Sequence, residues 1–264
     1  MHKKMIAGNW KMHCGQSATS DFINKLEDWL ESDETGTRSS KAIESELIEI
    51  VIAPPFTSIG AAVAARRSEK INISAQNVHY EPKGAFTGEI SLGMLEEAGC
   101  KYVIIGHSER RHVFGETNEL LERKLVATLE SKVLPIFCVG ELLADREAGR
   151  TETVLRQQLE AAWLSLTSDV VAEMLVVAYE PVWAIGTGKT ASDKDADDAC
   201  GFIRELAQEK FGVTTADALR ILYGGSVKPE NSAGILAQKN IDGLLIGSAS
   251  LDVDSFTKII TTSV

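Results

Sequence analysis

Hydrophobic residues alternate along the chain between two patterns. Short, almost continuously apolar runs are typical of parallel strands that are buried on both faces. Between these runs, apolar residues recur every three or four positions, which is the period of a helix with one buried face. We predict eight strands, at Lys4–Asn9, Ile48–Ala53, Ile71–Gln76, Tyr102–Gly106, Val133–Val139, Leu175–Glu180, Arg220–Tyr223 and Gly243–Gly247.

The segments between the strands predict helices. The best-marked helix starts at Ser192, a residue that can cap it, and ends at Gly212, which can terminate it. Eight β-α units indicate either a closed (β/α)₈ barrel or a doubly wound open sheet, and the even count without a second composition block favours the barrel. Two further apolar stripes have helical spacing: Phe22, Leu26, Trp29 and Leu30, and Leu121, Leu125 and Leu129.

One polar stretch interrupts the alternation of strand and helix patterns. Residues 32–45, between the first helix and the second strand, include Gly36, Ser39 and Ser40 and contain little apolar sequence. We interpret the stretch as a solvated surface extension of a single domain that spans residues 1–264. A docking segment is the alternative.

Composition and charge exclude several classes of partner. The chain of 264 residues has 27 Lys plus Arg against 38 Asp plus Glu, a net charge of −11. An acidic protein is poorly suited to bind nucleic acid or an anionic membrane. No apolar run approaches the length of a membrane span, and the first residues do not resemble a secretory signal. Four scattered cysteines without a Cys-x-x-Cys pair are typical of reduced thiols, so we expect a cytoplasmic protein.

Polar and ionisable residues gather where strands end. In a (β/α)₈ barrel the active site lies at the carboxyl ends of the strands. Asn9-Trp10-Lys11 follows the first strand, His107 follows the fourth, and Glu180 ends the sixth. Each residue alone has an ordinary structural explanation, as a solvated charge, a hydrogen-bonded histidine or a paired carboxylate. Their convergence on one rim predicts an active site.

Glycine-rich turns follow the last two strands. Gly224-Gly225-Ser226 and Gly247-Ser248 stand where many barrels bind phosphate on backbone N–H groups. Two ordinary tight turns are the alternative interpretation.

Two other patterns resemble cofactor sites but fail on spacing. Gly186-Thr187-Gly188-Lys189-Thr190 looks like the end of a nucleotide-binding loop, yet the required earlier glycine would stand at Trp183, and no strand directly precedes the segment. His107, Glu109 and His112 do not have metal-ligand spacing, and the two arginines between them oppose a cation. We therefore expect no cofactor and no metal.

Several segments together resemble the triosephosphate isomerase family. The resemblance spans essentially the whole chain, in order and spacing, and the segment that begins at Ala178 is highly specific. The segments are Asn9-Trp10-Lys11, Ala85-Phe86-Thr87-Gly88-Glu89, Ile105-Gly106-His107-Ser108-Glu109-Arg110-Arg111, Ala178-Tyr179-Glu180-Pro181-Val182-Trp183-Ala184-Ile185-Gly186-Thr187-Gly188 and Tyr223-Gly224-Gly225-Ser226-Val227.

The resemblance implies an aldose-ketose isomerase that interconverts dihydroxyacetone phosphate and D-glyceraldehyde 3-phosphate through an enediolate, in glycolysis and gluconeogenesis. It implies that Glu180 is the base, that neutral His107 polarises the carbonyl, and that Lys11 supplies positive charge. Asn9 and Trp10 would also contact the substrate. No cofactor enters this reaction.

The resemblance also implies how the phosphate is bound and enclosed. Backbone N–H groups of Gly186, Ser226, Gly247 and Ser248 would hold the phosphate, although family members commonly have glycine where Ser248 stands. Residues 181–190 would form a lid over the substrate. Tyr223 and Ser226 would bond the closed lid, and Glu109 would hold Lys11.

The loop of residues 77–90 resembles the family's dimer loop. Thr87 at its tip would reach the site of a second copy near Asn9 and Lys11, so we expect a homodimer. Two alternatives stay open on the sequence alone. Another phosphate-binding barrel accounts for the glycine turns but not for Lys11, His107 and Glu180 together. A non-catalytic scaffold would be favoured had one of these three been lost, and all are present.

Overall fold

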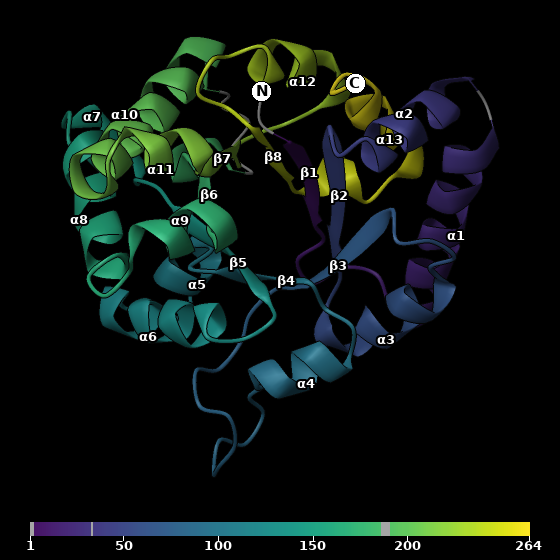
Figure 1. The fold of residues 1–264 in the computed structure, drawn as a ribbon, viewed down its shortest axis with the longest axis horizontal. Coiled ribbons are helices and arrows are strands. Elements are labelled where there is room, and N and C mark those ends of the chain that lie inside the picture. The colour runs from purple at the N-terminus through teal and green to yellow at the C-terminus, as the bar shows by residue number, and fades with distance from the viewer. Residues whose placement is uncertain (1–2, 33, 186–190) are drawn as a thin grey trace.

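The computed structural model describes residues 3–32, 34–185 and 191–264, and its eight parallel strands form a closed barrel surrounded by helices (Figure 1). The predicted single-domain (β/α)₈ barrel is confirmed. Each strand pairs in parallel with the next, and β8 pairs with β1. The strands are β1 (Lys4–Asn9), β2 (Ile48–Ala53), β3 (Ile71–Ala75), β4 (Tyr102–Ile105), β5 (Leu134–Val139), β6 (Val176–Tyr179), β7 (Arg220–Tyr223) and β8 (Gly243–Ile246).

Several strands are one residue shorter than their apolar runs. Gly106 and Glu180 were predicted as strand residues, but each lies just beyond its strand. Gly106 has a positive φ of 73°, which a strand does not accommodate, so β4 ends before it. The residues that leave the sheet in this way are the ones that form the rim of the barrel.

The helices lie outside the strands and two segments form short 3₁₀ helices. The predicted helix from Ser192 to Gly212 is confirmed as α10, because Ser192 and Asp195 form a capping box and Gly212 ends the helix with a φ of 88°. The helices are α1 (Gln16–Ser32), α2 (Glu34–Glu44), α3 (Phe56–Ala65), α4 (Leu92–Glu97), α5 (Ser108–His112), α6 (Asn118–Leu129), α7 (Leu143–Glu147), α8 (Thr151–Ala162), α9 (Ser168–Met174), α10 (Asp193–Phe211), α11 (Val213–Ala218), α12 (Pro229–Leu236) and α13 (Val253–Thr261), with 3₁₀ helices at Val182–Ala184 and Ser248–Ser250.

Helix α2 occupies most of the polar stretch that we interpreted as a surface extension. It contacts α1, α13 and β2. Ser40 is buried, and its hydroxyl donates to the carbonyl oxygen of Leu30 at 2.7 Å. Small hydroxyl side chains can face a helix interface in this way, so a polar sequence here includes one packed face as well as an exposed one.

Two apolar layers are separated by the sheet. One lies inside the barrel and the other between the strands and the surrounding helices. On β2, for example, Ile50 and Ile52 belong to the outer layer, whereas Val51 and Ala53 belong to the inner one. This alternation explains why the strand sequences are apolar at successive positions.

The amino-terminal end of the barrel is closed by an ion cluster around Glu49 on β2. The Glu49 carboxylate accepts from Lys101 Nζ at 2.7 Å, from Arg220 Nη1 at 2.8 Å and from Asn72 Nδ2 at 3.2 Å. Burial opposes ionisation of this side chain, but the hydrogen bonds and charges of Lys101 and Arg220 outweigh it and lower the pKa of Glu49 to about 2. The cluster therefore links β2, β3, β4 and β7 far from the carboxyl-terminal rim.

The described helices include none long and apolar enough to cross a membrane. The four cysteines, Cys14, Cys100, Cys138 and Cys200, are all free thiols.

We expect Glu49→Gln to lower the free energy of unfolding at pH 7 by about 3 kcal/mol, because the Arg220 and Lys101 charges lose the buried carboxylate that is their partner. The pKa of Glu49 lies below the ordinary glutamate value of 4.5, so the stabilisation is complete above about pH 4.5 and is lost as the pH falls toward 2. Urea unfolding of both proteins at pH 7 and pH 3.5, at equal protein concentration, measures the difference.

The matched control is Glu69→Gln, which removes an exposed carboxylate paired with Arg66 and should cost less than about 1 kcal/mol. A loss for Glu49→Gln that is as large at pH 3.5 as at pH 7 would contradict the assignment of the stabilisation to the ionised carboxylate.

Candidate active site

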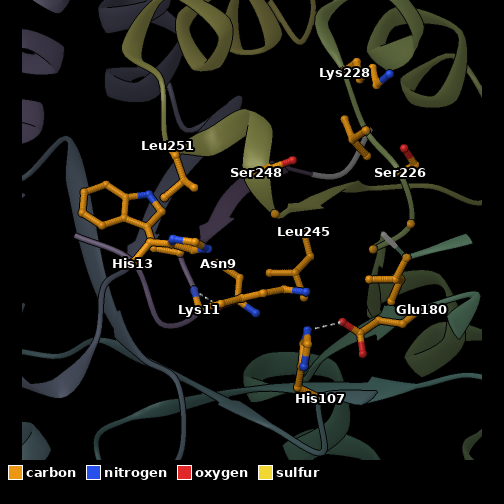
Figure 2. Close-up of a pocket in the computed structure, with 16 residues that line it drawn as sticks. Asn9, Lys11, His13, His107, Glu180, Ser226, Lys228, Leu245, Ser248 and Leu251 are labelled. Atoms are coloured by element: carbon orange, nitrogen blue, oxygen red, sulfur yellow. Dashed lines mark hydrogen bonds and ion pairs between the residues drawn. The ribbon is translucent and has the colours of Figure 1, made fainter. Parts of the chain in front are cut away.

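The carboxyl ends of β1, β4, β6, β7 and β8 surround a cavity of about 440 Å³ (Figure 2). Eight of the residues predicted as site residues from the sequence line this cavity. Gly186 and the rest of residues 186–190 lie outside the described residues. The predicted residues that line the cavity are Asn9, Trp10, Lys11, His107, Glu180, Ser226, Gly247 and Ser248.

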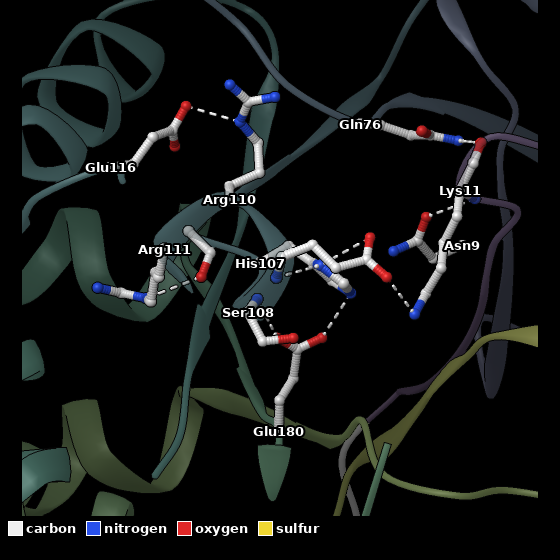
Figure 3. Close-up of polar contacts among 11 residues, drawn as sticks. Asn9, Lys11, Gln76, His107, Ser108, Arg110, Arg111, Glu116 and Glu180 are labelled. Atoms are coloured by element: carbon white, nitrogen blue, oxygen red, sulfur yellow. Dashed lines mark hydrogen bonds and ion pairs between the residues drawn. The ribbon is translucent and has the colours of Figure 1, made fainter. Parts of the chain in front are cut away.

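Glu180 follows β6 directly and is only 2% exposed. Its Oε2 atom accepts from the backbone N–H of Ser108 at 2.9 Å, and its Oε1 atom lies 3.1 Å from His107 Nε2 (Figure 3). Its backbone N–H donates to Val139 O on β5 at 2.8 Å, which fixes where the side chain starts. The carboxylate is therefore buried and held by donors on the segment that follows β4.

His107 caps the amino terminus of α5, and this position selects its tautomer. The Nδ1 atom accepts the backbone N–H of Glu109 at 3.2 Å, so Nδ1 has no proton of its own. The proton of the neutral ring therefore resides on Nε2, which donates to Glu180 and points toward the cavity. The imidazole can offer an N–H to a substrate oxygen without being charged.

Lys11 follows β1 in a left-handed backbone conformation, with a φ of 50° that a non-glycine residue rarely adopts. Asn9 Oδ1 accepts its N–H at 3.0 Å, and Gln76 Nε2 donates to its carbonyl oxygen at 2.8 Å (Figure 3). Its Nζ lies 2.8 Å from Glu109 Oε1. Burial raises the pKa of Glu109, but the Lys11 hydrogen bond and nearby charge outweigh it, so the pKa falls. The predicted contact between Glu109 and Lys11 thus exists in the structure.

Trp10, Tyr223 and Thr87, which were also predicted as site residues, lie in the core, at the end of β7 and on an exposed loop. Trp10 is fully buried, donates to Ser250 O at 3.0 Å and packs against Phe22, so most of its ring belongs to the core beneath the cavity. Tyr223 ends β7, and its buried hydroxyl has no hydrogen-bond partner among the described residues. Thr87 is exposed on the loop between β3 and α4, which projects from the barrel at the bottom of Figure 1.

Three supporting residues were not predicted as site residues. Gln76 and Ser108 hold Lys11 and Glu180 through single hydrogen bonds, which no sequence pattern indicates. Glu141 follows β5 and is fully buried, where it accepts from Tyr179 Oη at 3.1 Å and from Trp183 Nε1 at 2.8 Å. Its place just beyond a strand was an available signal.

Two further basic side chains line the cavity. They are His13, two residues after Lys11, and Lys228, two residues after Ser226. Their positions just after the first and seventh strands could have been used to find them. Across residues 3–32, 34–185 and 191–264, no group of three or more histidine, cysteine or acidic side chains is arranged to hold a metal ion.

The cavity therefore combines a buried carboxylate, a neutral imidazole that offers an N–H, and an ammonium group. A carboxylate can remove a proton beside a carbonyl group, while N–H and ammonium donors stabilise the oxyanion that results. The first turn of the 3₁₀ helix at Ser248–Ser250 adds backbone N–H groups of the kind that bind anions.

Comparison with known proteins identifies the family. The sequence model described as triosephosphate isomerase matches residues 4–263. The chain is 49% identical to triosephosphate isomerase of Solibacter usitatus, over 98% of this chain and 99% of the relative. It is 48% identical to triosephosphate isomerase of Moorella thermoacetica over 98% of each chain, and 47% identical to that of Carboxydothermus hydrogenoformans over the full length of both.

The chain belongs to the triosephosphate isomerase family. The family resemblance seen in the sequence is thereby confirmed, and the protein is an isomerase. Membership decides against both alternatives left open above, another phosphate-binding barrel and a non-catalytic scaffold.

We expect Gly224→Ala to displace Glu180. A methyl group at this position would lie 2.9 Å from Glu180 Cγ and 3.3 Å from Tyr179 O, both closer than an ordinary contact. The Glu180 side chain must then move, and its Oε1 atom should lie farther than 3.1 Å from His107 Nε2. A crystal structure of the variant measures the displacement.

Gly60→Ala is the matched control, because a methyl group added at Gly60 within α3 meets nothing within 4 Å. Alanine at this position should stabilise the helix by up to about 1 kcal/mol and leave Glu180 in place. An unmoved Glu180 in Gly224→Ala would refute the close-packing argument.

Proposed function

We propose that the protein interconverts dihydroxyacetone phosphate and D-glyceraldehyde 3-phosphate through an enediolate, as an enzyme of glycolysis and gluconeogenesis. The observation that supports this most directly is that Lys11, His107 and Glu180 line one cavity. The named relatives, which are triosephosphate isomerases, support the same reaction.

In the proposed reaction Glu180 removes a proton from C1 of dihydroxyacetone phosphate, and the electron pair forms the C1–C2 double bond. The C2 oxygen gains negative charge, which the His107 Nε2–H and the Lys11 ammonium stabilise. A proton moves from the C1 oxygen to the C2 oxygen by way of His107. The Glu180 carboxyl then returns its proton to C2, which yields the aldehyde at C1. No cofactor is needed.

The base must be released before it can act. In the structure both carboxylate oxygens of Glu180 are engaged, by Ser108 N–H and by His107 Nε2. We propose that the carboxylate rotates toward the substrate when it binds, since a carbonyl oxygen of the substrate would compete for the same His107 proton. Asn9 and Trp10 complete the substrate contacts on the β1 side of the cavity.

The phosphate of the substrate is proposed to rest on the backbone N–H groups of Ser226, Gly247 and Ser248, and of Gly186. Ser248 is exposed, and its contact to phosphate would be made by the main chain, so a side chain larger than hydrogen does not remove the donor.

A lid of residues 181–190 is proposed to close over the bound substrate. The buried Tyr223 hydroxyl, for which the described residues offer no partner, supports a hydrogen bond from Tyr223 to this closed lid. Ser226 would make a second one. Exclusion of water strengthens the electrostatic contacts and protects the enediolate.

We further propose a homodimer built by the loop of residues 77–90. Apolar side chains are exposed on this loop and after neighbouring strands, including Phe86, Met12 after β1, and Phe114 after α5. Gln76, just before the loop, bonds Lys11, so the base of the loop and the β1 end are adjacent. Thr87 would reach the second copy near its Asn9 and Lys11. We also propose that the chain forms one domain and that the protein is located in the cytoplasm.

Glu180→Gln should lower kcat by a factor of about 10² to 10⁴, because the amide cannot accept the proton. A coupled assay of the isomerisation with purified proteins measures kcat of the wild-type protein and of the variant. The exposed Glu152→Gln on α8 is the control and should retain the full rate. An unchanged kcat in Glu180→Gln would exclude Glu180 as the base, and an inactive wild-type protein would exclude the proposed reaction.

Sedimentation of the wild-type protein at micromolar concentration should give the mass of a dimer. Thr87→Arg brings a bulky cation to the place that the proposal puts near Lys11 of the second copy, so it should shift the protein toward monomer. Thr214→Arg, on the exposed surface of α11, should stay dimeric. A wild-type protein that sediments as a monomer would contradict the proposed homodimer.

A further inference from the structure

Arg111 on α5 is a cation with neutral partners. Its guanidinium donates to Gly106 O at 2.8 Å, to Asn118 Oδ1 at 2.8 Å and to Cys138 O at 2.9 Å. Within the described parts of the chain, no carboxylate forms an ion pair with it. Burial lowers the pKa of Arg111 to about 10, so the group is still protonated at neutral pH. A poorly solvated charge without a counter-charge destabilises the folded protein, so its presence here calls for a functional reason.

Glu180 has the opposite charge and the same lack of an ionic partner. Its carboxylate accepts from the Ser108 N–H and from the neutral His107 ring. Among the residues that the structure describes, neither lysine nor arginine forms an ion pair with it. Two opposite charges are thus held at one rim by neutral groups.

The same two strand ends hold both charges. The carbonyl oxygen of Cys138 on β5 accepts from Arg111, while the thiol of Cys138 faces Glu180. Likewise the carbonyl oxygen of Gly106 accepts from Arg111, and the next two residues, His107 and Ser108, hold Glu180 (Figure 3). The two charges also interact: burial lowers the pKa of Arg111, and the charge of Glu180 acts in the opposite direction and raises it.

The other ionisable groups around Glu180 are neutral or already paired. Burial and the charge of Glu180 raise the pKa of Cys138 well above the ordinary thiol value, so Cys138 is uncharged. Lys11 is paired with Glu109. The other groups are Glu116, paired with Arg110 and Lys124, Glu141, bonded by Tyr179 and Trp183, and His112, whose pKa is lowered by burial and by Arg111.

We propose that Arg111 supplies the positive charge that keeps the buried Glu180 ionised and so ready to accept a proton. This inference rests on the proposed role of Glu180 as the base. Arg111 acts through Glu180 and does not touch the substrate, so it is a positioning residue that sets the charge state of the site.

Asn118→Asp is the sharpest test, because it changes charge and leaves shape intact. The new carboxylate would stand 2.8 Å from Arg111 Nη1 and compensate its charge. The acid limb of the pH profile of kcat/KM should move to higher pH by about one unit, with no loss of stability. The substrate phosphate titrates identically for every variant, so only the difference between variants counts.

Arg111→Met should move the acid limb in the same direction, whereas Arg111→Lys, which retains the charge but not the three-way hydrogen bonding, should move it far less. Glu119→Gln is the control, because Glu119 neighbours Asn118 but its side chain is solvated, and the acid limb should stay in place. If Arg111→Met does not fold, Asn118→Asp decides.

An acid limb that is unchanged in Asn118→Asp, or that moves equally in Arg111→Lys and Arg111→Met, would overturn the inference, because hydrogen bonding would then account for Arg111. These outcomes require an active wild-type enzyme. An inactive wild-type enzyme would refute the proposed reaction instead, so the two failures are distinguishable.

Discussion

Closure of eight parallel strands is the constraint on which the rest of the molecule depends. Every strand pairs on both edges, so all carboxyl ends meet at one rim whatever their distance in the sequence. Asn9 at the end of β1 and Glu180 after β6 face one cavity for this reason. The opposite end of the barrel is available for a purely stabilising ion cluster around Glu49. Site and stability are thereby separated along the barrel axis.

A single short segment organises the ionisable groups at the rim. Residues 106–111 leave β4 and turn into α5, and they supply the Ser108 N–H that holds Glu180 and the Glu109 N–H that sets the tautomer of His107. The same turn contains Arg111, whose guanidinium binds the ends of β4 and β5. Glu180, His107 and Arg111 are therefore fixed relative to one another by contacts with the backbone of this turn and of the adjacent strand end.

Net charge describes this protein poorly at the scale of its site. A charge of −11 argues against nucleic acid and would repel an anionic substrate at long range. At the cavity, however, Lys11, His13 and Lys228 and the backbone N–H groups of the rim are the nearby donors. Exposed acids on outer helices are screened by salt beyond about 8–10 Å, whereas contacts inside the cavity are not. Local geometry therefore outweighs total charge.

The positions of the eight strands, the capped helix α10 and the family could all be predicted from the sequence. Hydrophobic period and capping residues are local properties, so every predicted strand end lies within one residue of the observed end. Gln76, Gly106, Glu180 and Gly247, for example, lie just beyond the strands that were predicted to include them. The residues at the rim were also predictable, because strand ends and family motifs mark them. Helix α2 was missed, because its packed face combines serines with only two apolar residues, Ala42 and Ile43, so its apolar signal is weak.

The sequence by itself determined the order of strands and helices and the residue types at the rim. Only the tertiary structure decided which donor holds Glu180, which nitrogen of His107 bears the proton, and that Gln76 secures the backbone of Lys11. It also decided that Arg111 faces neutral oxygens on two strands. The physical reason is that periodicity is set by neighbours along the chain, whereas these hydrogen bonds join residues that meet only when the barrel closes.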